Sequence, residues 1–170
     1  MAETKTENKD NFNSMMFGYL HSSSYYPIKR SFGQTLQSCD MDALIAYTKL
    51  SKNKNPVEQN IEFLVAGLCY NVTRPDQERH TYVRFEDDLA RLNRTEEIER
   101  FLKLRYDNDG YFAKRFYSLA KKVIPLLGPD EQFNYTKLRN DLKNWNLNNN
   151  VKMQWAMAIA RSSFNNEEGN

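Results

Sequence analysis

The apolar residues of the second half of the chain recur every three or four positions, and this spacing restricts the fold more than any other feature. It predicts helices over residues 96–106, 111–127, 134–145 and 151–162. In the second of these, Phe112, Phe116 and Leu119 fall on one face, as in a helix that packs against a core. Few runs alternate with the period of a strand, and the chain has only 6 Gly and 5 Pro. We therefore expect an all-α fold with no sheet.

The first half of the chain is also predicted to be helical. Pro56 opens the helix that we expect to be the most buried of this half, with Ile61, Leu64 and Leu68 on its apolar face. The polar segment RPDQERHTY then marks a boundary between two small helical bundles packed side by side. The expected ranges are 1–26 for a disordered or irregular N-terminal segment, 27–82 for the first bundle, 83–163 for a basic second bundle and 164–170 for a frayed tail.

Positive charge is concentrated in the second half. Residues 100–161 contain 12 Lys and Arg against 5 Asp and Glu, a net charge of +7, whereas the whole chain of 170 residues carries +2. The segment 111–127 has no acid, and its basic residues form a stripe opposite its apolar face. For any single Lys or Arg, a solvated helix face is the more frequent explanation. Together they suggest a polyanion partner, whose phosphates such a surface would neutralise without reading bases.

The sequence offers little catalytic chemistry. His21 and His80 are the only histidines, and they lie far apart in polar segments. No phosphate-loop, dinucleotide, nucleophile-elbow or zinc-binding spacing is present. Cys39 and Cys69 stand alone, as expected of inert thiols in a reducing cytosol. We therefore expect a protein that is not an enzyme and that holds no cofactor and no metal.

Nothing in the sequence predicts a membrane protein. No segment approaches the ~20 apolar residues that span a bilayer. The polar start, MAETKTENKDNFNS, is neither a signal peptide nor a typical transit peptide. We expect a cytoplasmic protein that has no membrane partner.

Four segments of the second half follow one another in a characteristic order: IERFLKLRY, a basic helix that ends in KKVIPLL, YTKLRNDLKNW and VKMQWAMAIA. Their most characteristic residues are Arg100-Phe101, Leu138, Asp141-Leu142, Trp145 and Trp155-Ala156. In this order the chain resembles the CasB family, the small subunit of the type I-E CRISPR Cascade surveillance complex. The resemblance is weaker in FLVAGLCYN and IKRSFGQ, and it extends over about residues 28–160.

The resemblance implies a fold and a role. CasB proteins are all-helical, are built as two small bundles and have no enzymatic activity. Two copies assemble head to tail along the belly of Cascade, beside its backbone and large subunits. They hold the guide RNA–target DNA hybrid and the displaced strand through basic side chains, which stabilises the R-loop. R-loop formation is a nearly balanced exchange of base pairs, so modest backbone contacts can tip it, and sequence specificity belongs to the guide RNA.

We expect nucleic-acid contacts from basic side chains of both halves. The candidates are Lys29, Arg30, Arg94, Arg100, Lys103, Arg105, Lys114, Arg115, Lys121, Lys122, Arg139 and Lys143. For Arg100 the alternative is a structural ion pair, because an Arg beside a core Phe often forms one. Tyr111, Tyr117 and Tyr135 are candidates for stacking on splayed bases, with core packing the favoured role of Tyr135. The spacing of Trp145 and Trp155 predicts core residues.

One alternative function remains open, that of a helical protein–protein adaptor without a nucleic-acid role. Its basic face would then dock onto an acidic protein surface. The two functions differ in their response to salt, because phosphate binding weakens steeply as salt rises.

Overall fold

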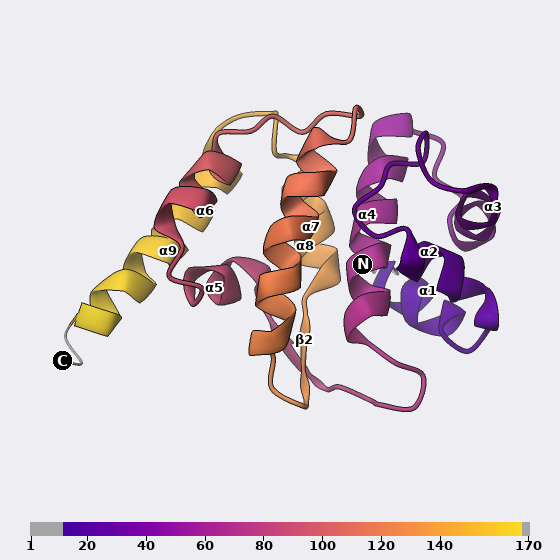
Figure 1. Cartoon of the computed structure of the whole chain (residues 1–170), viewed down its shortest axis with the longest axis horizontal. Coiled ribbons are helices and arrows are strands. Elements are labelled where there is room, and N and C mark those ends of the chain that lie inside the picture. Colours follow the sequence, from indigo (N-terminus) through magenta and orange to yellow (C-terminus); the bar gives the residue numbers. More distant parts are fainter. Residues whose placement is uncertain (1–11, 168–170) are drawn as a thin grey trace, which may run out of the picture.

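The computed structural model describes residues 12–167, which fold mainly into α-helices (Figure 1). The helices are α1 (Phe12–Tyr19), α2 (Tyr26–Arg30), α3 (Met41–Leu50), α4 (Pro56–Val72), α5 (Phe85–Ala90), α6 (Thr95–Leu102), α7 (Tyr111–Val123), α8 (Tyr135–Lys143) and α9 (Asn150–Glu167). Two short 3-10 turns, η1 (Ser23–Tyr25) and η2 (Ile124–Leu126), extend α2 and α7. The prediction of a mainly helical fold is confirmed.

The expectation that the chain contains no sheet is wrong. β1 (Thr81–Val83) and β2 (Glu131–Phe133) pair in parallel, with Tyr82 opposite Gln132. Strands of three residues leave almost no alternation to recognise, and parallel pairing joins segments that are distant in the sequence. β1 lies in the connection between α4 and α5, and β2 lies in the connection between α7 and α8, so their hydrogen bonds hold these two connections together.

Local capping chemistry explains where several helices begin and end. The Asp40 side chain accepts a hydrogen bond from the backbone N–H of Ala43 at the start of α3. Asn55 caps α4 in the same way, directly before Pro56. α7 ends at Val123 and continues only as η2, because Pro125 lacks the N–H that an α-helix needs.

The start of α6 differs from the sequence pattern. Asn93 and Glu96 have the spacing of a capping box, but Asn93 has a φ of 53° and lies before the N-cap residue, Arg94. No side chain caps this helix. Instead, Glu96 and Glu97 lie in its first turn, where negative charge interacts favourably with the helix dipole.

One continuous core joins the two halves of the molecule. In Figure 1, α1–α4 lie on one side, α5, α6 and α9 on the other, and α7 and α8 between them. Trp145 and Trp155 are fully buried in this core, with ring centroids 5.2 Å apart in an edge-on arrangement. Phe32 of the first half packs against Phe116 of the second half, with ring centroids 6.4 Å apart. The prediction of core positions for both tryptophans is confirmed.

The ends of the described chain are more regular than expected. Phe12 and Met16 of α1 are buried, and the Tyr70 hydroxyl donates to the Met16 carbonyl at 3.1 Å. Residues 12–19 therefore form a helix where an irregular segment was expected, and residues 1–11 lie outside the described residues. α9 likewise continues to Glu167, so the tail is helical over residues 164–167, and residues 168–170 lie outside the description.

Candidate nucleic-acid interface

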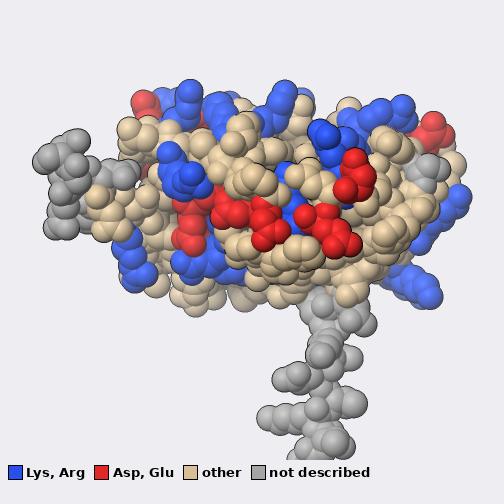
Figure 2. Space-filling view, turned by 90° about the horizontal axis from the view of Figure 1, so that it is seen from below, with Lys and Arg blue, Asp and Glu red and all other residues tan. Residues whose placement is uncertain are grey.

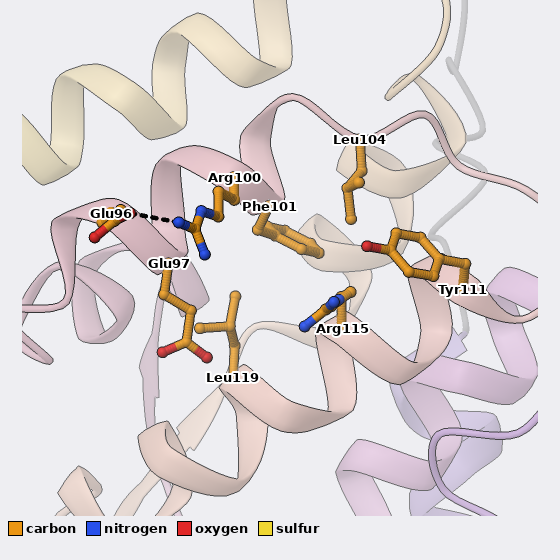
Figure 3. A pocket seen from close by; sticks show the side chains of 8 residues that line it. All are labelled: Glu96, Glu97, Arg100, Phe101, Leu104, Tyr111, Arg115 and Leu119. Atoms are coloured by element: carbon orange, nitrogen blue, oxygen red, sulfur yellow. Dashed lines mark hydrogen bonds and ion pairs between the residues drawn. The ribbon is translucent and has the colours of Figure 1, made fainter.

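A pocket of about 340 Å³ opens between α6 and α7 (Figure 3). Phe101 and Leu119 are almost completely buried and form its apolar floor together with Leu104. The polar side chains at its rim are Glu96, Glu97, Arg100, Tyr111 and Arg115. In Figure 3, Tyr111 lies at one end of the pocket and the Glu96–Arg100 pair at the other. The pocket therefore combines an apolar surface with both signs of charge.

Tyr111 and Arg115 lie one turn apart on α7 and contact each other. The Arg115 guanidinium carbon is 5.1 Å from the centre of the Tyr111 ring, which is the geometry of a cation–π interaction. The Tyr111 side chain is 50% exposed. Arg115 forms no ion pair with any carboxylate of residues 12–167. This pair is thus available to a ligand.

The acids of α6 form ion pairs with three of the basic residues that were predicted to contact nucleic acid. Arg100 pairs with Glu96 one turn away, so the ion pair considered for Arg100 in the sequence is confirmed. Both side chains are more than two-thirds exposed, and such a surface pair contributes less than about 1 kcal/mol. Lys122 donates to both oxygens of Glu97, at 2.6 and 2.8 Å, and Arg94 lies 3.9 Å from the same carboxylate.

The basic stripe of α7 divides between two edges of the helix. Arg115 and Lys122 lie on the edge that faces α6. Lys121 lies on the other edge, with its Nζ 5.2 Å from the centre of the Tyr117 ring, and Tyr117 packs against Phe32. The acid-free sequence of α7 gave no sign of this division, because the carboxylate that pairs with Lys122 comes from another helix.

Seven of the predicted contacts pair with no carboxylate in the described part of the chain. They are Lys29, Arg30, Lys103, Arg105, Lys114, Arg115 and Lys121. Lys29 is half-buried, and the other six are exposed. Five of the seven belong to α7 or to the connection between α6 and α7, so unpaired positive charge gathers around this part of the molecule.

Arg139, one of the predicted nucleic-acid contacts, lies inside the fold rather than on its surface. Its side chain is buried, with the guanidinium 4.6 Å from the centre of the Phe12 ring and 3.9 Å from Glu62. Burial lowers the pKa of this guanidinium. Lys143 lies close by at 3.7 Å from Glu58 and is only a quarter exposed. Both side chains point toward α4 because α8 packs on it.

Charge on the face seen in Figure 2 is mixed rather than uniformly basic. Acidic side chains gather along the middle of this face, and Lys and Arg lie around them. A polyanion would be repelled from the middle of this face. This face is therefore not uniformly basic, although residues 100–161 carry a net charge of +7 in the sequence.

The structure brings together two histidines that the sequence separates. His21 and His80 both line a pocket of about 220 Å³, together with Arg74 and Arg79. The His80 side chain is 70% exposed and lies 3.6 Å from Glu78. The pocket forms where the end of α1 meets the connection before β1, a meeting that no local sequence pattern predicts.

Two further features concern only residues 12–167. No group of three or more His, Cys, Asp or Glu side chains among them is placed to hold a metal ion. None of their helices combines the length and the apolar run that crossing a bilayer requires.

Comparisons with protein-family models, with curated proteins and with solved structures give no match. The fold and the pocket define a small, mainly helical protein with a partly basic groove. The resemblance to the CasB family stays a prediction. Most residues that carry it, such as Phe101, Leu142 and Trp145, are buried, so the resemblance concerns the core rather than the surface.

Proposed function

We propose that this protein binds the nucleic-acid backbone without catalysis, as a small subunit of a type I-E Cascade complex. The observation that carries the proposal is the group of cations on α7 and just before it that pair with no carboxylate between residues 12 and 167. Lys103 and Arg105 follow α6, and Lys114, Arg115 and Lys121 lie on α7. When a cation binds a phosphate, counterions are released from the nucleic acid, and this release favours binding. A cation that forms no ion pair with a carboxylate can bind the phosphate without first breaking such a pair.

The spacing of the cations suits a strand laid along α7. Lys114 and Lys121 are seven residues apart, which is about 10 Å along a helix at ~1.5 Å per residue. Three nucleotide steps of ~3.4 Å span a similar length. The rise between the two lysines is therefore similar to that of three nucleotide steps in a stacked strand, and phosphate contacts position a strand without reading its sequence.

The proposed partners follow from this role. Guide RNA paired with target DNA would supply the sequence specificity, and the displaced strand would supply further phosphates. A second copy of the subunit and the backbone and large subunits would hold the protein in the cytoplasmic complex. Affinity of the isolated subunit would be modest, because neighbouring subunits raise the effective concentration of nucleic acid.

Charge reversal with a matched control tests the proposal. We expect the triple variant Lys103→Glu, Lys114→Glu and Lys121→Glu to bind single- and double-stranded DNA more weakly. Its plot of log affinity against log salt should lose about 0.7–0.9 in slope for each phosphate contact removed. The control is Lys49→Glu, Lys52→Glu and Lys54→Glu, three exposed lysines of the other half. Equal losses in both triple variants, or none in either, would contradict the proposal.

The same two triple variants test the assignment to Cascade. Each would be combined with the guide-RNA-loaded complex, and the lifetime of the R-loop would be measured. We expect a shorter lifetime with the first triple variant and an unchanged lifetime with the control. Failure of the wild-type chain to join the complex would reject the assignment and leave simple backbone binding to be judged from the salt dependence.

One observation favours the adaptor as the second candidate function. Met153 and Met157 lie one turn apart on α9 and are 55% and 47% exposed. Adaptable apolar side chains on one helix face are typical of protein-binding surfaces. An adaptor would show little affinity for DNA at any salt concentration, which separates it from the first proposal.

A further inference from the structure

We propose that the pocket between α6 and α7 takes one unstacked base of a single strand, which stacks against the Tyr111–Arg115 pair. The inference rests on the proposed binding of nucleic acid and adds a base-binding site to it. Proteins that hold single strands combine cations for the backbone with aromatic platforms for the bases. Here the two kinds of side chain meet in one pocket (Figure 3).

The floor of the pocket suits a flat ring. Phe101 and Leu119 are 2% and 1% exposed, so they are held rigidly by the core below them. Leu104 completes the apolar surface. A volume of about 340 Å³ falls within the range of small-ligand pockets. A base that leaves its stack would cover this surface and remove it from water.

The Tyr111–Arg115 pair supplies the stacking platform. Tyr111 is the first residue of α7, and Gly110 before it has a φ of +93°, which turns the chain into the helix. The ring is half exposed, and the guanidinium lies 5.1 Å from its centre. Unstacked bases stack on Tyr rings and on Arg planes alike. Arg115 also carries an unpaired charge next to the platform.

The acids at the far end orient the ligand. Glu96 pairs with Arg100, and Glu97 pairs with Lys122 and, at 3.9 Å, with Arg94, but a carboxylate has about four acceptor positions, and these partners leave some of them open. The two carboxylates repel a phosphate and accept hydrogen bonds from the N–H groups of a base edge. A nucleotide would therefore enter base first, with its phosphate outside the pocket. A base with an exocyclic amino group, such as cytosine, would fit best.

The occupant could instead be an apolar side chain of a partner protein, and the row of unpaired cations beside the pocket argues against it. Lys103 and Arg105 adjoin the lining residue Leu104 in the sequence, Lys114 adjoins Arg115, and all three are exposed. Their charge would attract a polyanion to this part of the molecule. A peptide that binds only through apolar contacts with the floor of the pocket would not interact with these three cations.

Abasic strands provide the test. The affinity of the full-length protein would be measured for a short single-stranded cytosine oligonucleotide and for the same backbone with abasic sites throughout. We expect Tyr111→Ala to weaken binding of the cytosine strand about tenfold and to leave the abasic strand unchanged. Tyr111→Phe should retain the wild-type affinity. Lys114→Glu should weaken binding of both strands equally, because it removes only a phosphate contact.

A matched control and a folding control complete the design. Tyr82→Ala removes a ring that is 49% exposed in β1, far from this pocket in the sequence, and should change neither affinity. Thermal unfolding would show that each variant is folded. If Tyr111→Ala is unfolded, Tyr111→Leu keeps apolar volume without an aromatic face and should give the same selective loss.

Each outcome decides between the two proposals. If Tyr111→Ala weakens binding of both strands equally or of neither, while Lys114→Glu weakens both, the base site is wrong and backbone binding stands. If the wild-type protein binds neither strand at low salt, both proposals fail. If Tyr111→Ala blocks assembly with a protein partner and leaves strand binding intact, the pocket holds a peptide and the base site is rejected.

Discussion

Lys122 donates from its Nζ to both carboxylate oxygens of Glu97, at 2.6 and 2.8 Å, and so links α7 to α6. Its neighbour Lys121 points to the other edge of α7, where it contacts the Tyr117 ring and no carboxylate of the described residues. Two adjacent lysines thus have different surroundings. In the sequence they belong to one basic stripe, and in the structure one supports the fold while the other is available to a ligand.

We therefore expect different results from reversing the charge of each lysine. Lys121→Glu should reduce the salt dependence of DNA binding by about 1 in log–log slope and change the free energy of unfolding by less than about 0.5 kcal/mol. Lys122→Glu should lower the free energy of unfolding by about 1 kcal/mol, because it places like charges together at a half-exposed site. Urea unfolding and salt titrations would measure both effects. Identical behaviour of the two variants would contradict the division of the stripe.

A second prediction concerns the charged cluster of α5, α8 and α9. Lys137 donates at 2.6 Å to Glu86 and at 2.6 Å to Asp141, which also accepts from the Trp155 indole at 2.9 Å. Burial alone would lower the pKa of Lys137, but its hydrogen bonds to the two carboxylates outweigh burial and raise it. We expect Lys137→Met to cost about 3 kcal/mol of unfolding free energy, because it leaves the buried carboxylate of Glu86 with only the more distant Arg84, at 3.9 Å.

Two further variants check the origin of this loss. Lys103→Met changes an exposed lysine and should alter the free energy of unfolding by less than about 0.5 kcal/mol. The double variant Lys137→Met with Glu86→Gln should recover part of the stability, since the buried charge is gone. Additive losses from the two substitutions would show that they do not act on one shared interaction.

A third prediction concerns the contact between Gly33 and Tyr117. Gly33 has a φ of +94°, and a Cβ built on it would lie 2.8 Å from Cγ of Tyr117. We expect Gly33→Ala to lower the free energy of unfolding by about 2–3 kcal/mol, from backbone strain and from the clash. Gly18→Ala in α1 is the matched control. A Cβ there meets nothing within 4 Å, so the substitution should stabilise the helix by about 0.5–1 kcal/mol. Thermal unfolding compares the two.

A fourth prediction concerns pH. The carboxylate of Asp130 accepts hydrogen bonds from the Thr81 hydroxyl at 2.8 Å and from the His80 backbone N–H at 3.1 Å, and these lower its pKa below the usual 3.8. Because the folded-state pKa is lowered, its contribution is fully present above about pH 4 and disappears as the pH falls through that lower value. Asp130→Asn should therefore be less stable than wild type at neutral pH, and the difference should shrink in acid.

Urea unfolding of both proteins between about pH 7 and about pH 3 measures this effect. The control is Asp109→Asn, because Asp109 is exposed and its carboxylate accepts no hydrogen bond within residues 12–167. It should show no such pH-dependent difference. A gap between wild type and Asp130→Asn that stays constant down to the lowest pH would reject the assigned role of the carboxylate.

Features that depend on near neighbours in the chain were predicted well. The opening of α4 at Pro56 and the buried face of α7 follow from residues a few positions apart, whereas the helix predicted over residues 111–127 ends as an α-helix at Val123. The core positions of Trp145 and Trp155 follow from the same period. Exact helix ends were less certain, because capping geometry rather than spacing sets them.

The candidate site was predicted only in part. The sequence located an excess of cations, and seven of the twelve predicted residues pair with no carboxylate of residues 12–167. Arg139 is buried beside Glu62 of α4, and Lys122 forms an ion pair with Glu97 of α6. Both acids come from segments that are distant in the sequence. The pocket at Tyr111 also needs two helices, so no single segment of the sequence shows it.

The sequence by itself determined the helices and the residues of their apolar faces, since hydrogen bonds within a helix and the burial of one face act between near neighbours. Only the tertiary structure decided the parallel pairing of β1 with β2, the partner of each charged side chain and the pocket between α6 and α7. The physical reason is distance along the chain. These contacts join residues that meet only when the whole core closes, and the strength of a charge pair depends on the burial that this closure creates.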